Sequence, residues 1–517
     1  MKFLTKLLNK YKKQKKNNQI FKLLGIEMPN KSVFNDKEKI LRLFSINCND
    51  LAQCCINSDK VFEEIVGDLS SRKETQIHNV YKRLAFDFRI RGRPDLYVFY
   101  LEKSLKLVKD LRTIDSLFHA LVLAPDIRDS DFKNAALLSK IVCGETRKPH
   151  KMQNIQEKQK INIGYTCCYF YHLGSRIHSL PLMKSHNRDR FNVFAFSDSD
   201  GVDESGVADK WICTKDLSDD EFSRVVKDNQ IDILVELNGR GDYNRFGSFR
   251  KRVAPIQVSF ANFPATSGAD YVDCCIADKN AIEEKLGEFF SEKVYTFKKV
   301  GVDFELCWPN NFFPDVTDIP SAKNGYVTYG CFGGTLKINV PLIQKWIKLM
   351  KMDSTGLLYI KSSPMSDPDV LNAYYNLFEM YGMDMKRLKL EGGEGHKTML
   401  EKYSLLDVAL DTFPYSGGNT SLEALWQGVP VITLSGKRWA SCITTGFYKT
   451  MELDRFTTTT WDEYLQQAIS IGKNENYRTE FRKQSRRIMK ESELLNIKSH
   501  TRYIEEIYEK MVLEILH

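Results

Sequence analysis

The chain has 517 residues, of which 42% are hydrophobic and 27% charged, and its formal net charge is +8. This composition predicts a globular protein of about three domains and excludes disordered, collagen-like and small disulfide-stabilised chains. Seven lysines within the first sixteen residues account for nearly all of the net charge. The remainder is close to neutral, so we expect no nucleic-acid partner.

The N-terminus and the cysteines predict a cytoplasmic protein. Lys6 interrupts the short apolar run at the N-terminus, which is not typical of a secretory signal. No stretch of the sequence approaches the ~20 apolar residues that a membrane span needs. The twelve cysteines contain no C-x-x-C and the nine histidines no H-E-x-x-H, so we expect neither a metal site nor a metal cofactor.

The spacing of apolar residues within 1–150 predicts a helical N-terminal region. Its first apolar residues share one helical face surrounded by lysines: Phe3, Leu4, Leu7, Leu8 and Tyr11. We favour a solvated helix here. The alternative is weak contact with a membrane surface or an acidic partner.

Two series of short apolar runs, alternating with helical segments, follow in the chain. Within 151–315 the predicted strands are 160–168, 191–197, 231–237, 256–260 and 272–278. Within 316–480 they are 326–332, 356–361, 387–392, 407–411 and 430–434, and helices fill 481–517. This alternation predicts two α/β domains with parallel, doubly wound sheets, and a ligand in the cleft that their strand ends face.

The segment LDTFPYSGGNTSLEALWQGVPVITLSG, residues 410–436, carries the clearest binding signal. A predicted strand ends at Asp411, and a glycine-containing loop leads into a helix. Glycines allow a phosphate to approach the backbone, and a helix start presents unpaired N–H groups and the positive end of the helix dipole. We therefore expect a nucleoside diphosphate here, at Gly417, Gly418, Asn419, Thr420 and Ser421.

Glu423, in the same segment, admits two interpretations. With Thr420 it fits the S/T-x-x-E capping box at a helix start. Alternatively, its carboxylate accepts hydrogen bonds from ribose hydroxyls. Spacing alone does not separate the two interpretations.

Several segments, taken in order, resemble the O-GlcNAc transferase/SPINDLY group, glycosyltransferase family 41, and especially its bacterial members. They are DSLFHALVLAPDIRDSDF (115–132), KINIGY…FYH (160–172), APIQVSFANFPATSGADYVDCCIAD (254–278), FFSEKVYTF (289–297), YGCFGGTLKI (329–338) and the segment 410–436. The resemblance covers about residues 115–455.

The resemblance implies a GT-B fold, in which two Rossmann-like domains face a cleft. Residues 151–315 would form the acceptor side and 316–480 the nucleotide-sugar side. It also implies an inverting, metal-independent enzyme that moves a sugar, GlcNAc by default, from a UDP-sugar to Ser or Thr of a protein. A surface protein or adhesin is an acceptor suggested by analogy.

Roles for individual residues also follow from the resemblance. Lys337 matches the family lysine at the diphosphate, His172 its active-site histidine, and Glu423 its acidic residue at the ribose. His396 lies three residues before Met399, where the family has a histidine near the nucleoside. The matching residues on the acceptor side are Pro264, Thr266 and Ser267.

Two alternatives stay open. A UDP-sugar 2-epimerase shares the fold and would convert its substrate without an acceptor. A non-catalytic partner that binds the acceptor is suggested by Tyr169, Gly333 and Gly334, where the family commonly has other residues. The sequence also matches the D-x-D metal motif at 198–200 and 367–369, but we interpret these as a turn and a helix cap.

Overall fold

The computed structural model describes residues 73–144, 159–168, 170, 173–199, 206–260, 263–282, 290–298, 300–304 and 312–515. The predicted N-terminal basic helix and His172 therefore lie outside the described residues. Within these ranges, no helix is long and apolar enough to cross a membrane.

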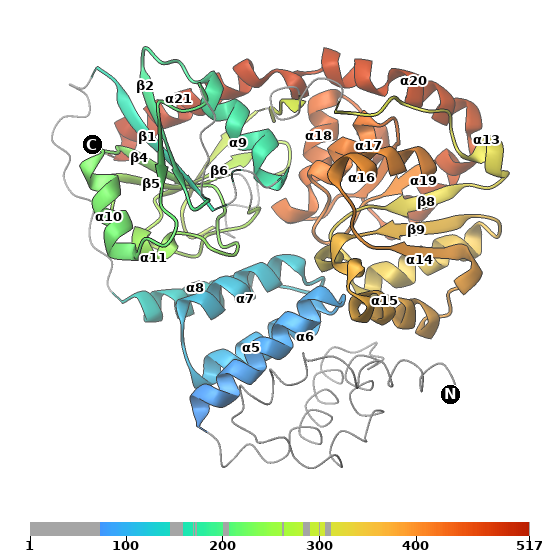
Figure 1. Ribbon diagram of the computed structural model, residues 1–517, viewed down its shortest axis with the longest axis horizontal. Coiled ribbons are helices and arrows are strands. Elements are labelled where there is room, and N and C mark those ends of the chain that lie inside the picture. Colours follow the sequence, from blue (N-terminus) through green and yellow to red (C-terminus); the bar gives the residue numbers. More distant parts are fainter. Residues whose placement is uncertain are drawn as a thin grey trace.

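In the part of the chain that the structure describes, a bundle of four helices precedes the first sheet. These helices are α5 (Glu74–Ile90), α6 (Pro94–Leu107), α7 (Leu111–Leu123) and α8 (Asp129–Cys143). Asp110 caps α7 by accepting a hydrogen bond from the Thr113 backbone N–H at 3.0 Å. The apolar core of the bundle continues onto Phe263 and Ala440, one from each sheet domain. The bundle therefore lies against both halves of the molecule (Figure 1).

The first sheet has seven parallel strands in the order β3-β2-β1-β4-β5-β6-β7. They are β1 (Ile161–Cys167), β2 (Phe191–Ser197), β3 (Lys210–Cys213), β4 (Ile233–Glu236), β5 (Ile256–Phe260), β6 (Cys274–Asp278) and β7 (Lys293–Phe297). Helices α9 (Leu173–Ser185), α10 (Asp219–Asp228) and α11 (Phe246–Phe249) belong to this domain. All five strands predicted here are confirmed, while the edge strands β3 and β7, which bury fewer residues, were not predicted.

The second sheet has six parallel strands in the order β10-β9-β8-β11-β12-β13. They are β8 (Thr328–Cys331), β9 (Leu357–Lys361), β10 (Leu388–Glu391), β11 (Val408–Leu410), β12 (Val431–Leu434) and β13 (Thr457–Thr458). Its helices are α13 (Ser321–Asn324), α14 (Val340–Met352), α15 (Pro368–Met380), α16 (His396–Lys402), α17 (Asn419–Trp426), α18 (Ile443–Met451) and α19 (Trp461–Lys473). Strand order reverses between β8 and β11, so the loops after these two strands open towards a ligand site.

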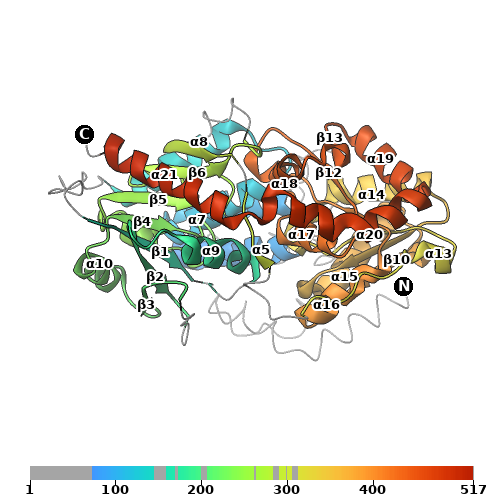
Figure 2. The same cartoon turned by 90° about the horizontal axis from the view of Figure 1, so that it is seen from above.

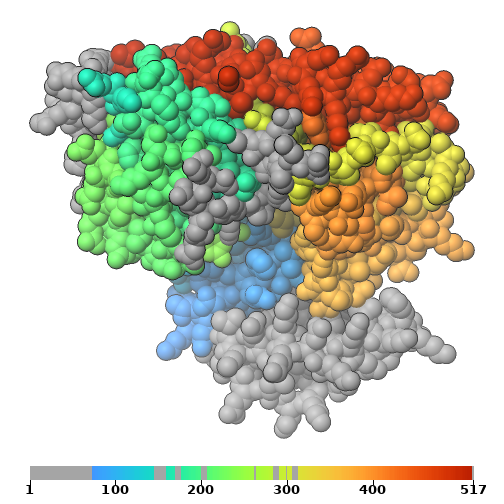
Figure 3. Space-filling view, turned by 45° about the horizontal axis from the view of Figure 1, so that its top comes forward, coloured from blue at the N-terminus to red at the C-terminus, as the bar shows by residue number. Residues whose placement is uncertain are grey.

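Two long helices, α20 (Glu475–Glu491) and α21 (Ile497–Ile515), run along both sheet domains (Figure 2). The predicted boundary at residue 480 falls inside α20, which packs on α17 of the second domain. Helix α21 returns to the first domain and packs on α9 and β7. Figure 3 shows this helical band over both halves, with the four-helix bundle adjoining them from below.

A buried polar network fastens α21 to the first domain. His186 contacts the Tyr165 hydroxyl at 2.8 Å through Nε2 and Glu505 of α21 at 3.0 Å through Nδ1. The Tyr165 hydroxyl also lies 3.0 Å from that of Tyr508. These buried side chains are one another's hydrogen-bond partners. Without α21, Tyr165 and His186 of the first domain would lose the partners that Tyr508 and Glu505 provide.

Candidate active site

A cleft of about 770 Å³ lies between the two sheet domains and the four-helix bundle. All three parts of the fold line it: His119 comes from α7, Asn238 and Asp242 follow β4, and Lys337 and Asn419 belong to the second domain. A volume of this size suits a nucleotide-sized ligand.

The loop between β11 and α17 is held by Asp411, which is buried at the end of the strand. Its Oδ1 accepts hydrogen bonds from the backbone N–H groups of Gly417 at 2.5 Å and Thr412 at 2.8 Å. Its Oδ2 accepts one from Thr433 Oγ1 at 2.7 Å. A Cβ on Gly417 would lie 1.9 Å from Ser421 Oγ, so this position requires glycine.

Helix α17 begins at Asn419, and the residue before it, Gly418, provides no side-chain cap. Thr420 therefore lies inside the helix, and the structure does not support the capping-box interpretation of Thr420 and Glu423. The first turn of the helix, at the cleft, presents its positive dipole end to a ligand. This geometry supports the interpretation of 417–421 as an anion site.

Glu423 instead pairs with His396, the first residue of α16. Glu423 Oε1 lies 2.8 Å from His396 Nε2, and both side chains line the cleft. The ring of Phe312 lies 5.3 Å from the His396 ring, centroid to centroid. The structure therefore brings together two residues that the sequence assigned separately to the nucleoside.

Lys337 lies on the short 3-10 helix Thr335–Lys337 after β8. Its Nζ donates a hydrogen bond to the Ser416 carbonyl at 2.8 Å, beside the glycine loop. Burial lowers the pKa of Lys337 to about 8, and the charge of Asp411 opposes this shift. A poorly hydrated ammonium group next to a helix start is suited to an anionic ligand, because the anion would restore its lost electrostatic stabilisation.

The predicted acceptor-side residues divide into two groups. Pro264 lines the cleft, but Thr266 and Ser267 are buried and are not among its lining residues. Thr266 Oγ1 donates to Glu292 Oε2 at 2.6 Å, and the Ser267 N–H donates to Glu292 Oε1 at 2.6 Å. Their polar groups are thus used to hold a buried carboxylate, so the structure does not support acceptor contacts by these two residues.

Three histidines that line the cleft were not predicted as site residues: His119, His178 and His500. Nδ1 of His119 is buried without a hydrogen-bond partner in the part of the chain that the structure describes. Burial and the nearby Arg89 charge lower the pKa of His119 to about 3, so its imidazole is neutral at physiological pH. The segment 115–132 was recognised, but one histidine in a helical pattern gives no signal of its own.

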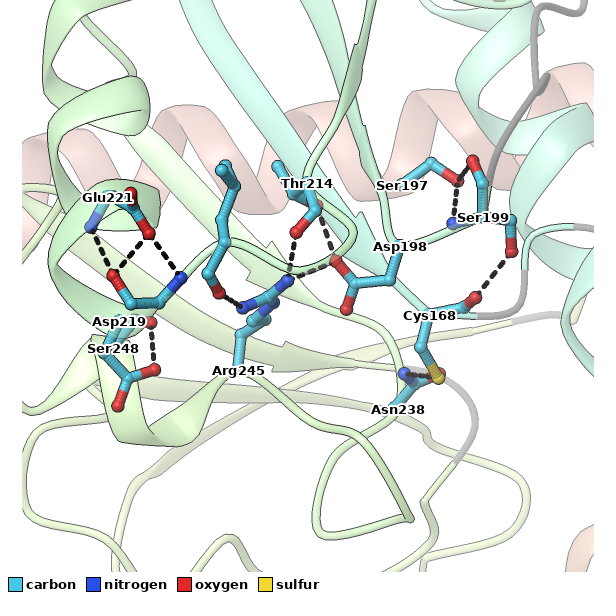
Figure 4. A network of polar contacts seen from close by, with 12 residues as sticks. Cys168, Ser197, Asp198, Ser199, Thr214, Asp219, Glu221, Asn238, Arg245 and Ser248 are labelled. Carbon is cyan, nitrogen blue, oxygen red and sulfur yellow. Dashed lines mark hydrogen bonds and ion pairs between the residues drawn. The ribbon is translucent and has the colours of Figure 1, made fainter.

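The two D-x-D matches have structural roles. Asp198, the residue after β2, accepts hydrogen bonds from Thr214 Oγ1 at 2.7 Å and from Arg245 (Figure 4). Asp367 caps α15 by accepting from the Asp369 N–H at 2.9 Å. The interpretation of 367–369 as a helix cap is confirmed, while Asp200 lies outside the described residues, so the interpretation of 198–200 as a turn stays a prediction. No group of three His, Cys, Asp or Glu side chains in the described ranges is arranged to hold a metal ion.

Two parallel α/β sheets that face a shared cleft, with the last helix returning to the first sheet, define the GT-B class of transferase folds. The chain belongs to glycosyl transferase family 41: the sequence model of this family matches residues 130–302 and 319–504. The family resemblance and the fold class drawn from the sequence are confirmed.

Curated relatives include plant proteins. One is the probable UDP-N-acetylglucosamine–peptide N-acetylglucosaminyltransferase SPINDLY of Solanum lycopersicum, 28% identical over 364 residues, with 68% of this chain and 38% of that protein covered. Another is the probable enzyme of the same description named SEC in Arabidopsis thaliana, 26% identical over 314 residues, with 56% and 30% covered. The chain thus matches less than half the length of these relatives.

A solved structure of an O-GlcNAc transferase mutant from Thermobaculum terrenum superposes with a TM-score of 0.76 at 22% identity. The superposition covers 98% of this chain and 99% of that one. At this identity, the likeness establishes the fold, including the helices that precede the first sheet.

Proposed function

We propose that this protein is an inverting glycosyltransferase that moves a sugar, GlcNAc by default, from a UDP-sugar to Ser or Thr of a protein acceptor. Family membership supports the reaction class. The observation that carries the proposal is the convergence of the Lys337 ammonium, the start of α17 and the His396–Glu423 pair on one cleft.

In the proposed reaction, the acceptor hydroxyl oxygen attacks the anomeric carbon as the bond to the diphosphate breaks on the opposite face. Lys337 Nζ and the N–H groups at the start of α17 stabilise the negative charge that develops on the leaving diphosphate. The His396–Glu423 pair would bind the ribose hydroxyls. Because Lys337 supplies a fixed cation, we propose that the reaction needs no metal.

The acceptor proton needs a base on the side of the cleft opposite the diphosphate. A pKa of about 3 makes His119 too weak a base for this role, so we propose instead that its neutral imidazole, whose buried Nδ1 has no partner among the described residues, accepts a hydrogen bond from the acceptor hydroxyl. The role of His172 stays a prediction. So do a cytoplasmic location and an acceptor of the surface-protein or adhesin kind.

A thermal-shift panel of UDP, GDP, CDP and ADP in EDTA tests the donor site. A ligand at about 100 times its Kd should stabilise the fold by about 2.7 kcal/mol. We expect a shift with UDP that weakens in Lys337→Ala and persists in the surface control Lys323→Ala. No shift with any diphosphate would contradict the enzyme proposal and favour a non-catalytic partner.

Product analysis separates the two enzymatic alternatives. Incubation of the protein with UDP-GlcNAc alone should leave the donor unchanged apart from slow hydrolysis, and peptide acceptors should become glycosylated. Conversion of UDP-GlcNAc to an epimer without any acceptor would identify a 2-epimerase instead.

A further inference from the structure

His178 reaches across the cleft from one sheet domain to the other. It lies on α9 of the first domain, and its Nε2 is 3.1 Å from Oδ1 of Asn419 in the second. The two residues are 241 positions apart in the sequence. Both line the cleft, and Asn419 is the first residue of α17.

The hydrogen bond fixes the chemistry of both partners. Because an amide oxygen accepts, the imidazole must carry its hydrogen on Nε2. Burial lowers the pKa of His178 to about 4, so at neutral pH the ring is an uncharged donor. With its oxygen committed to His178, the Asn419 amide turns its NH₂ group, which is purely a donor, away from the imidazole.

The neighbours of Asn419 indicate what that NH₂ group would meet. Lys337 Nζ binds the carbonyl of Ser416, three residues earlier, and Gly418 leaves the helix start without a side-chain cap. A cation, a helix N-terminus and an amide donor at one place are complementary to a phosphate group, which only accepts hydrogen bonds when ionised.

We propose that His178 is a positioning residue for the donor: it orients the Asn419 amide so that its NH₂ donates to the diphosphate of the nucleotide sugar. This inference rests on the proposed function. If His178 has this role, residues of both sheet domains form the diphosphate subsite. A bound donor would then favour the arrangement in which α9 and α17 are in contact.

Isothermal titration with UDP and with uridine, which lacks the diphosphate, tests the inference. His178→Leu should bind UDP about tenfold more weakly, as expected for a lost or misoriented hydrogen bond to a charged group. Its affinity for uridine should stay unchanged, which also shows that the variant is folded. His178→Gln places an amide donor close to the position of Nε2 and should recover most of the UDP affinity.

A double-mutant cycle separates positioning from a general structural effect. In an Asn419→Ala background, His178→Leu should cause no further loss of UDP affinity, because the group it orients is already gone. Lys184→Ala, an exposed substitution on the same helix, is the matched control and should bind UDP like the wild type.

The outcomes distinguish this inference from the proposed function. Wild-type protein that binds no UDP would overturn the proposed function, and the inference with it. Wild-type protein that binds UDP while His178→Leu binds it equally well would overturn the inference alone. So would an equal loss of UDP and uridine affinity, or additive losses in the double mutant.

Discussion

Lys337 holds its ammonium nitrogen 3.9 Å from the centre of the Tyr415 ring, over its face. The electron-rich face of an aromatic ring attracts a cation, and Tyr415 itself lines the cleft. The ring and the Ser416 carbonyl thus hold the ammonium in place before any ligand arrives. This prearrangement means that little reorganisation is needed when charge develops on a leaving diphosphate.

Removing this cation should affect the chemical step more than substrate binding. We expect Lys337→Met to reduce kcat by about 10²–10³, the cost of losing one prearranged charge-stabilising group. Initial rates with a peptide acceptor would measure this loss. A variant with wild-type kcat would show that the diphosphate is stabilised elsewhere, and Lys323→Ala serves as the surface control.

Donor affinity should depend on pH through the same side chain. The pKa of Lys337 is lowered to about 8 in the free protein, so its charge is lost as pH rises through that value. UDP binds the charged form, so affinity should be highest below pH 8, fall above it, and be coupled to proton uptake near pH 8. Titrations between pH 7 and 9 would measure this dependence.

Lys337→Arg offers the control for the pH dependence. Its guanidinium stays charged throughout this range, so the decline in affinity above pH 8 should disappear. A decline of equal size in Lys337→Arg would assign the titration to another group.

The ribose contact should be detected by a donor analogue. The wild type should prefer UDP over 2′-deoxy-UDP, and Glu423→Gln should lose about tenfold of that preference because its carboxylate no longer accepts hydrogen bonds from the hydroxyls. Competition binding with the two nucleotides gives the ratio directly. If Glu423→Gln leaves the ratio of the two nucleotide affinities unchanged, Glu423 has only a structural role, as the partner of His396.

Two glycines that differ in the space around them provide a matched pair for testing the loop. Gly417→Ala should lower the free energy of unfolding by about 1–3 kcal/mol, since its Cβ would overlap Ser421 Oγ, and should weaken UDP binding. Gly395→Ala meets nothing within 4 Å at a backbone conformation with φ −56° and ψ 145°, and should change stability by less than about 0.5 kcal/mol. Urea denaturation compares the two. Equal effects would mean that the loop is less tightly packed than the contacts of Asp411 indicate.

A hydrogen bond from the acceptor hydroxyl to His119 predicts that peptide turnover and UDP affinity respond separately to substitution. His119→Ala should lower kcat/KM for the peptide acceptor by about tenfold while the Kd for UDP stays at the wild-type value. Combined measurement of turnover and UDP binding would test this. Loss of both together would indicate that His119 supports the cleft and does not act on the acceptor.

Local pattern was enough to predict the sheets and the strand, glycine loop and helix that lie at the cleft. Parallel strands buried on both faces give continuous apolar runs, and the 410–436 segment combines a strand, a glycine turn and a helix in one short stretch. The edge strand β3 is four residues long and half-exposed, so it lacks such a run.

Contacts between distant segments could not be predicted in this way. Glu423 fits a capping box in sequence, and only the position of α16 reveals His396 as its partner. Thr266 resembles a cleft residue until Glu292, twenty-six positions later, is seen to occupy its hydroxyl. His119 and His178 are isolated histidines on helices, and their importance comes from which elements the fold places opposite them.

The fastening of α21 to the first domain has a consequence for the order of folding. The hydroxyl of Tyr165 finds its partner in Tyr508, 343 positions later, and His186 finds Glu505 after a separation of 319. While a ribosome is still adding the second sheet, the first one has a buried tyrosine and histidine without these partners. In a nascent chain, the first domain should therefore stay loosely packed and able to bind chaperones. It should pack fully only after α21 has been synthesised and contacts it.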